Sequence, residues 1–159
     1  MTNPLGSLVL GAILSIIGGF FGQEYGSWRQ QGRTRKLLCV LLTHEIHQMN
    51  RIVDKLIEAY ERTNVAYNIY LAELGNARTS YDRNSDWIIL FDEGLRQDIF
   101  DYFNKEQLTR GYLVNLNQAV GTTTPTPQYL VDEIRKQIQA FKEMRTLGEK
   151  ILPRVSFKS

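Results

Sequence analysis

The first 23 residues carry no charged side chain, and this feature limits the folds open to the chain more than any other. The run from Leu5 to Gly22 is apolar or small throughout. Counted from Asn3 it gives about 20 residues, or about 30 Å of helix, which matches the hydrocarbon thickness of a bilayer. We therefore predict a single transmembrane helix over residues 3–22.

Other structures for this segment fit the sequence less well. A cleaved signal peptide would carry basic residues before the apolar run, but the first basic residue is Arg29. A helix lying on the membrane surface would need a polar face, which the run lacks. A helix buried in a protein or oligomer core stays an alternative, although the later predicted helices are amphipathic rather than apolar all round.

Basic residues follow the apolar run and none precedes it. The positive-inside rule then places the N-terminus outside and the rest of the chain in the cytoplasm. Residues 23–34 are predicted to be a juxtamembrane basic hinge, because Gly26 and Gly32 lower helix propensity. The residues expected to set topology and attract anionic lipid headgroups are Trp28, Arg29, Arg33, Arg35 and Lys36.

Small residues recur along the apolar run at four-residue spacing. In lipid, helices associate by close packing, and small residues at this spacing allow two backbones to approach. Self-association is therefore predicted, while the alternative is that glycine and serine are simply common in membrane helices. The residues predicted to form the contact are Ser7, Gly11, Ser15, Gly18, Gly19 and Gly22.

A heptad seam begins after the basic residues and is predicted to form one long helix from residue 42 to Leu74, with Gly75 and Asn76 as its stop. Extra apolar residues beside the seam favour a helix in a bundle over a two-stranded coiled coil. The residues predicted to pack this helix are Leu42, Ile46, Met49, Val53, Leu56 and Tyr60.

The remaining sequence predicts two further helical regions. The apolar segment 87–91 is read as a helix start, and helical spacing that includes Leu108 and Tyr112 runs from about residue 95 to 120. A loop over 121–127 follows, with Thr126 as N-cap of a last helix that stops at Pro153. The fold class is all-α: a transmembrane helix, an antiparallel three- or four-helix bundle over 35–153, and a tail over 154–159.

The sequence carries no recognisable catalytic, cofactor-binding or metal-binding motif. His44 and His47 lie three residues apart and do not form H-E-x-x-H, so we interpret them as surface histidines. Cys39 lies among apolar residues and reads as a core residue. The net charge of +2 gives no sign of a nucleic-acid-binding protein.

These patterns predict a non-enzymatic, self-associating protein that is anchored in the membrane. Its expected partners are membrane lipids, further copies of the chain and an unidentified protein docked or scaffolded at the cytoplasmic face. The alternative is an oligomeric pore or membrane-permeabilising effector built from the N-terminal helix, because a ring of glycine- and serine-lined helices tolerates water.

Overall fold

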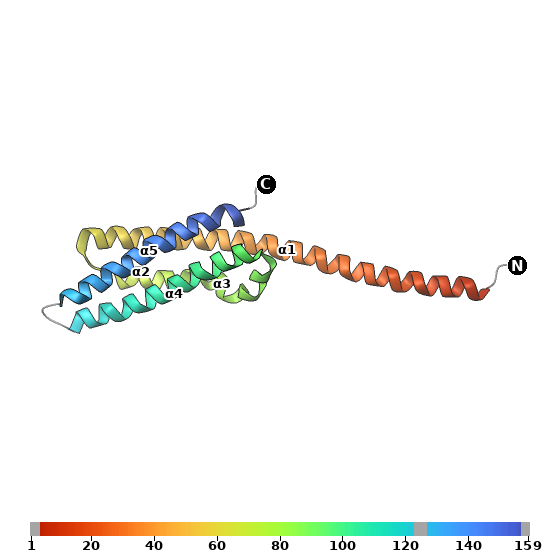
Figure 1. The fold of residues 1–159 in the computed structure, drawn as a ribbon, viewed down its shortest axis with the longest axis horizontal. Helices are drawn as coiled ribbons and strands as arrows, with labels where there is room; N and C mark the ends of the chain where they lie inside the picture. The colour runs from red at the N-terminus through yellow and green to blue at the C-terminus, as the bar shows by residue number, and fades with distance from the viewer. Residues whose placement is uncertain (1–3, 123–126, 157–159) are drawn as a thin grey trace.

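The computed structural model describes the backbone of residues 4–122 and 127–156, and side chains over 29–79, 81–122 and 127–156. All regular structure in these ranges is helical, which confirms the predicted all-α class (Figure 1). The elements are α1 (Pro4–Thr63), α2 (Asn68–Ala77), α3 (Thr79–Asn84), the 3-10 helix η1 (Ser85–Leu90), α4 (Glu93–Thr122) and α5 (Gln128–Val155).

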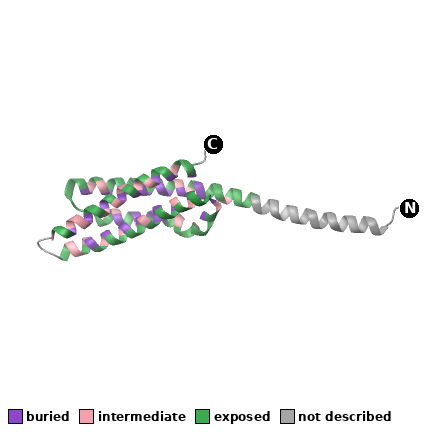
Figure 2. Ribbon diagram, in the orientation of Figure 1, coloured by how far each residue is buried: buried purple, intermediate pink, exposed green. Residues whose placement is uncertain are grey.

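Four helices pack into a bundle. The C-terminal half of α1 lies beside α2 and α5, and α4 completes the bundle against α2 and α5, while the N-terminal part of α1 projects away (Figure 1). Buried residues follow the inner side of each helix, and exposed ones the outer side (Figure 2). All six residues expected to pack the long helix lie in this core, namely Leu42, Ile46, Met49, Val53, Leu56 and Tyr60.

The backbone of α1 is one continuous helix of 60 residues, about 90 Å long at 1.5 Å per residue. It runs without a break through residues 23–34, where the glycines had suggested a hinge. A glycine weakens a helix by about 1 kcal/mol, and a sharp bend needs a further cause such as proline or an inserted group. Among residues 29–79, 81–122 and 127–156, no helix combines the length and the apolar character that a membrane span requires. The side chains of the predicted span, residues 3–22, lie outside the described part of the chain.

The long helix ends earlier than the heptad pattern predicts, at Thr63 rather than Leu74. Asn64 adopts a positive φ of 55°, a conformation that asparagine tolerates and that ends a helix. Its N–H still donates to the carbonyl of Tyr60 at 2.7 Å. The chain then turns back, and α2 packs on α1 with Leu74 buried. The apolar seam continues in sequence because both helices face the same core.

Three further predictions need correction. The segment 87–91 lies in η1 and its end rather than starting an α-helix, and α4 starts at Glu93, where the Asp92 carboxylate accepts the Leu95 N–H at 2.9 Å. In α4, Leu108 and Tyr112 are 64% and 48% exposed. The core positions there belong to Glu106 and Thr109. The last helix passes through Pro153 to Val155, and Thr126 lies outside the described residues.

A basic and apolar neck as the candidate functional site

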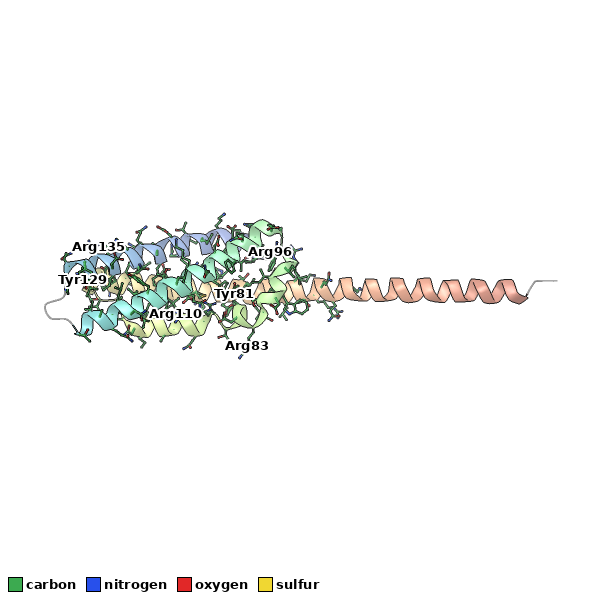
Figure 3. All side chains as sticks on the ribbon, turned by 60° about the horizontal axis from the view of Figure 1, so that its bottom comes forward. Tyr81, Arg83, Arg96, Arg110, Tyr129 and Arg135 are labelled. Carbon is green, nitrogen blue, oxygen red and sulfur yellow. The ribbon has the colours of Figure 1, made fainter. Side chains whose placement is uncertain are left out.

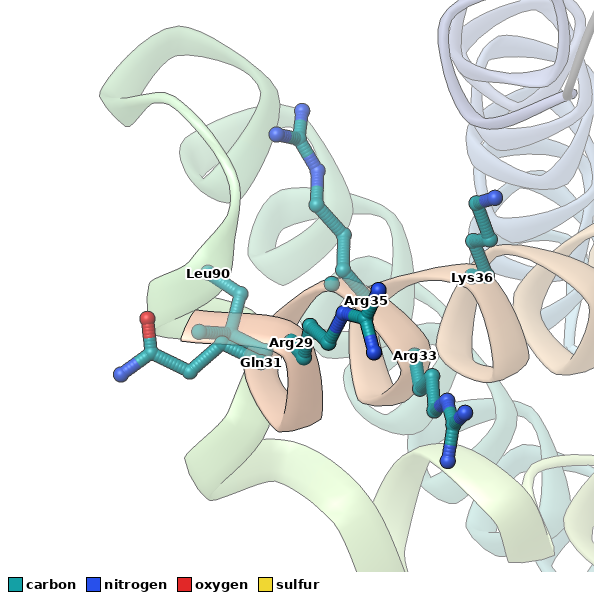
Figure 4. Close-up of a pocket in the computed structure, with 7 residues that line it drawn as sticks. Arg29, Gln31, Arg33, Arg35, Lys36 and Leu90 are labelled. Carbon is teal, nitrogen blue, oxygen red and sulfur yellow. The ribbon is translucent and has the colours of Figure 1, made fainter. Parts of the chain in front are cut away.

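The most distinctive surface lies where α1 leaves the bundle, over residues 29–41, which we call the neck. Its first two turns carry four exposed cations. Together with Gln31, Gly32 and Leu90 of η1 they line an open hollow of about 670 Å³ (Figure 4). The four cations are Arg29, Arg33, Arg35 and Lys36.

The neck cations point to different sides of α1. Arg33 and Arg35 point in opposite directions (Figure 4). The Arg35 guanidinium lies 5.7 Å from the centre of the Phe91 ring. A Cβ on Gly32 would meet no atom within 4 Å, so the helix surface between the cations is open. Arg29, Arg33 and Lys36 fall within about 60° of one another around the helix, whereas Arg35 lies on another side. Three cations spread over about two turns of one helix side fit an extended anionic surface.

An apolar patch adjoins these cations. Leu37 and Val40 of α1 are 61% and 63% exposed, and Trp87 of η1 is 46% exposed. Leu37 and Trp87 line one small hollow of about 40 Å³. The neighbouring Leu38 is buried, as is Cys39, whose pKa is raised by burial against the lowering effect of Arg35. The neck therefore has a buried side that belongs to the core and an exposed side that is partly apolar.

The structure brings together four of the five residues predicted to meet lipid headgroups. The fifth, Trp28, has its side chain outside the described part, as do the six small residues predicted to associate in the membrane. His44 and His47 are both exposed on α1. No three metal-ligating side chains lie together among the described residues.

A buried charged network lies deeper in the bundle and was not predicted from the sequence. Arg78, at the junction of α2 and α3, contacts Glu106 at 3.1 Å and Asp82 at 2.7 Å. Arg110 of α4 (Figure 3) contacts the same Glu106 at 2.6 Å. Burial alone would lower the pKa of Arg78, but its bonds to Asp82 and Glu106 raise it. Each charge of this network faces an opposite charge, so the network joins α2, α3 and α4.

A second set of polar contacts links the helices around Tyr102. The Tyr102 hydroxyl donates to Asn50 Oδ1 at 2.9 Å, and the Glu45 carboxylate accepts the Tyr81 N–H at 2.9 Å. Burial raises the pKa of Tyr102, and the nearby Glu106 and Glu45 carboxylates add to the shift. Gly148 lies against Tyr102 and Asn50. These groups are satisfied inside the bundle and hold α1, α3, α4 and α5 in one arrangement.

One signal in the sequence could have located the buried charges. Glu106 and Thr109 fall three or four residues from Phe103 and Leu113, which places them on the apolar side of α4. A charged residue at such a position must be paired, and Arg110 lies four residues after Glu106.

Comparison with known proteins adds no assignment. The chain matches no protein-family model, no curated protein and no solved structure. The function of the chain must therefore be inferred from its sequence and from the geometry of the neck.

Proposed function

We propose that this chain is a non-enzymatic, self-associating membrane anchor whose helical bundle stands at the cytoplasmic face and holds a protein partner there. Residues 3–22 span the bilayer, with the N-terminus outside. Arg29 reaches the anionic headgroups, and the later neck cations are attracted by the negative surface potential of the membrane. The bundle is the platform. The uncharged run of about 20 residues supports the span, and the basic residues that follow it support the orientation.

The continuity of α1 into the neck is the observation that carries this proposal. Arg29 lies seven residues after Gly22, which is about 10 Å along a helix. The headgroup layer beside the hydrocarbon core is about 5–8 Å thick on each side. Arginine side chains lean toward the N-terminus of their helix and extend their charge toward the interface, so Arg29 reaches the headgroups and Arg33 follows one turn further out.

Vesicle flotation with an alkaline wash tests the anchor. The full chain is expected to float with vesicles of phosphatidylcholine and phosphatidylglycerol and to resist the wash. Replacing two residues of the run, Leu14→Lys and Ile17→Lys, should abolish flotation, because each lysine at the centre of a span costs about 3 kcal/mol. The same change at two exposed bundle residues, Ile69→Lys and Leu108→Lys, should leave flotation intact. A wild-type chain left in the supernatant would refute the anchor.

Topology and function class are tested in the same vesicles and in cells. A cysteine at exposed Thr146 should react with a membrane-impermeant maleimide only after the cells are opened, whereas a cysteine at Thr2, which precedes the predicted span, should react from outside. Dye retained by the vesicles at high protein density agrees with a scaffold. Rapid dye release by the wild type, lost in the Leu14→Lys and Ile17→Lys variant, would replace the scaffold by a pore.

A further inference from the structure

We infer that one side of α1 forms a continuous contact between copies of this chain, and that Leu37 and Val40 of one copy pack against a second copy just outside the membrane. The inference rests on the proposed self-association within the membrane. It adds a second contact, at the base of the bundle, and it names the residues that make it.

The helical phase of α1 places these two residues below the small-residue positions. Leu37 follows Gly19 by 18 residues, and Val40 follows Gly22 by 18 residues. At 3.6 residues per turn, 18 residues make about five full turns. Because α1 is unbroken over Pro4–Thr63, Leu37 and Val40 lie on the same side of the helix as Gly19 and Gly22. The predicted membrane contact thus continues onto the exposed apolar side of the neck.

The bundle occupies the other side of α1. Leu38 and Leu42 are 3% and 0% exposed, whereas Leu37 and Val40 are 61% and 63% exposed. Leu42 follows Val40 by two residues, a rotation of about 200° around the helix. Two copies that meet through the Gly19 side therefore carry their bundles outward, and the bundles do not obstruct the contact at Leu37 and Val40.

The position of the patch favours a second copy over lipid. Leu37 lies 15 residues beyond Gly22, about 22 Å along the helix and outside the headgroup layer. Copies already joined within the membrane present the same two residues at the same height. Because the copies are already joined, the effective concentration of one neck beside the other is high, and a small apolar surface is enough to hold the two necks together.

The neck cations set the condition under which copies meet. Arg29, Arg33 and Lys36 follow Gly11, Ser15 and Gly18 by 18 residues each, so all three lie on the contact side. Two parallel copies bring these positive charges near one another, and their repulsion opposes association. The negative potential of an anionic membrane surface extends about a Debye length beyond the headgroups and lowers that repulsion, so the association of copies should be stronger in anionic than in neutral bilayers.

The mass of the full chain in nanodiscs containing phosphatidylglycerol tests the inference. The wild type is expected to be oligomeric. Leu37→Lys with Val40→Lys should weaken association by about tenfold or more, the effect of losing buried apolar contacts at a contact centre. The matched control is Leu108→Lys with Ile69→Lys, two residues that are 64% and 63% exposed on α4 and α2. It should associate as the wild type does.

A second measurement does not depend on a destabilising change. Leu37→Cys in adjacent copies should form a disulfide in oxidised membranes, whereas Leu108→Cys should not. A Leu37→Lys and Val40→Lys chain that assembles like the wild type, or equal crosslinking at both cysteine positions, would overturn the inference while leaving the anchor intact. A monomeric wild type that still floats would overturn the proposed self-association together with the inference.

Discussion

Arg78 and Glu106 are 28 residues apart in sequence, yet their side chains meet at 3.1 Å in the core. Removing one partner of a buried ion pair costs about 3–5 kcal/mol, so Glu106→Leu should lower the free energy of unfolding by that order. Arg78→Met should cost less, because Arg110 still faces Glu106 at 2.6 Å. The double variant should lose less free energy of unfolding than the two single variants lose together. Urea titration of the detergent-solubilised chain measures these losses.

The exposed pair of Glu58 and Arg62 serves as the control for that cycle. Surface ion pairs contribute about 0–1 kcal/mol, so Glu58→Leu with Arg62→Met should show almost no coupling. Equal coupling energies in the two pairs would contradict a structural role for the buried network.

Gly148 allows α5 to approach the core closely. A Cβ at this position would lie 2.7 Å from Tyr102 Cε2 and 2.9 Å from Asn50 Nδ2. Gly148→Ala should therefore destabilise the bundle by about 1–3 kcal/mol through overpacking. Gly111→Ala, on α4 with no atom within 4 Å, should stabilise it by up to about 1 kcal/mol because alanine favours helix. Melting temperatures that move in the same direction for both variants would argue against this packing.

Tyr102 makes the bundle sensitive to alkali. Its pKa in the folded chain is raised by burial above the ordinary value of 10.0. The group therefore stabilises the fold fully below pH 10 and loses that contribution as pH rises toward the folded pKa. Above pH 10 the free energy of unfolding of the wild type should fall with pH more steeply than that of Tyr102→Phe. The difference in slope should reach up to about 1.4 kcal/mol per pH unit. Parallel slopes in urea titrations from pH 9 to 11 would exclude this effect.

The turn at Asn64 reverses the chain between α1 and α2. At its φ of 55°, a β-branched side chain is strained, so Asn64→Val should destabilise the chain by about 1–2 kcal/mol. Asn64→Gly should be neutral or slightly stabilising. Asn104→Val, at an exposed helical position of α4, measures the helix-propensity effect of valine alone. Similar losses in thermal unfolding for the two valine variants would show that the turn is not strained.

Periodicity predicted most of the fold, because apolar spacing reports which side of a helix meets the core. It gave the helical class, and the six predicted packing residues from Leu42 to Tyr60 are all buried. It did not reveal the turn at Asn64, since Leu71 and Leu74 continue the apolar pattern after the chain has reversed. Two antiparallel helices facing one core share a pattern that a single longer helix would also show.

The candidate site was predictable only in part. Charge placement identified Arg29, Arg33, Arg35 and Lys36, because they follow the apolar run directly in sequence. The contributions of Leu90 and Trp87 to the neck depend on how η1 folds against α1, and such tertiary contacts leave no local pattern. The pairing of Arg78 with Glu106 is equally non-local, although the position of Glu106 among core residues was a usable sign.

The unbroken course of α1 makes the length of the neck a constraint in its own right. Inserting one residue between Gly22 and Leu37 turns everything beyond it by about 100° and displaces it by about 1.5 Å. Seven inserted residues turn it by only about 20° from the original direction. The length of the neck therefore fixes both the distance and the rotation between the predicted membrane segment and the bundle. Substitutions within the neck should be tolerated more readily than single-residue insertions or deletions, because an insertion or deletion changes the direction in which the bundle faces.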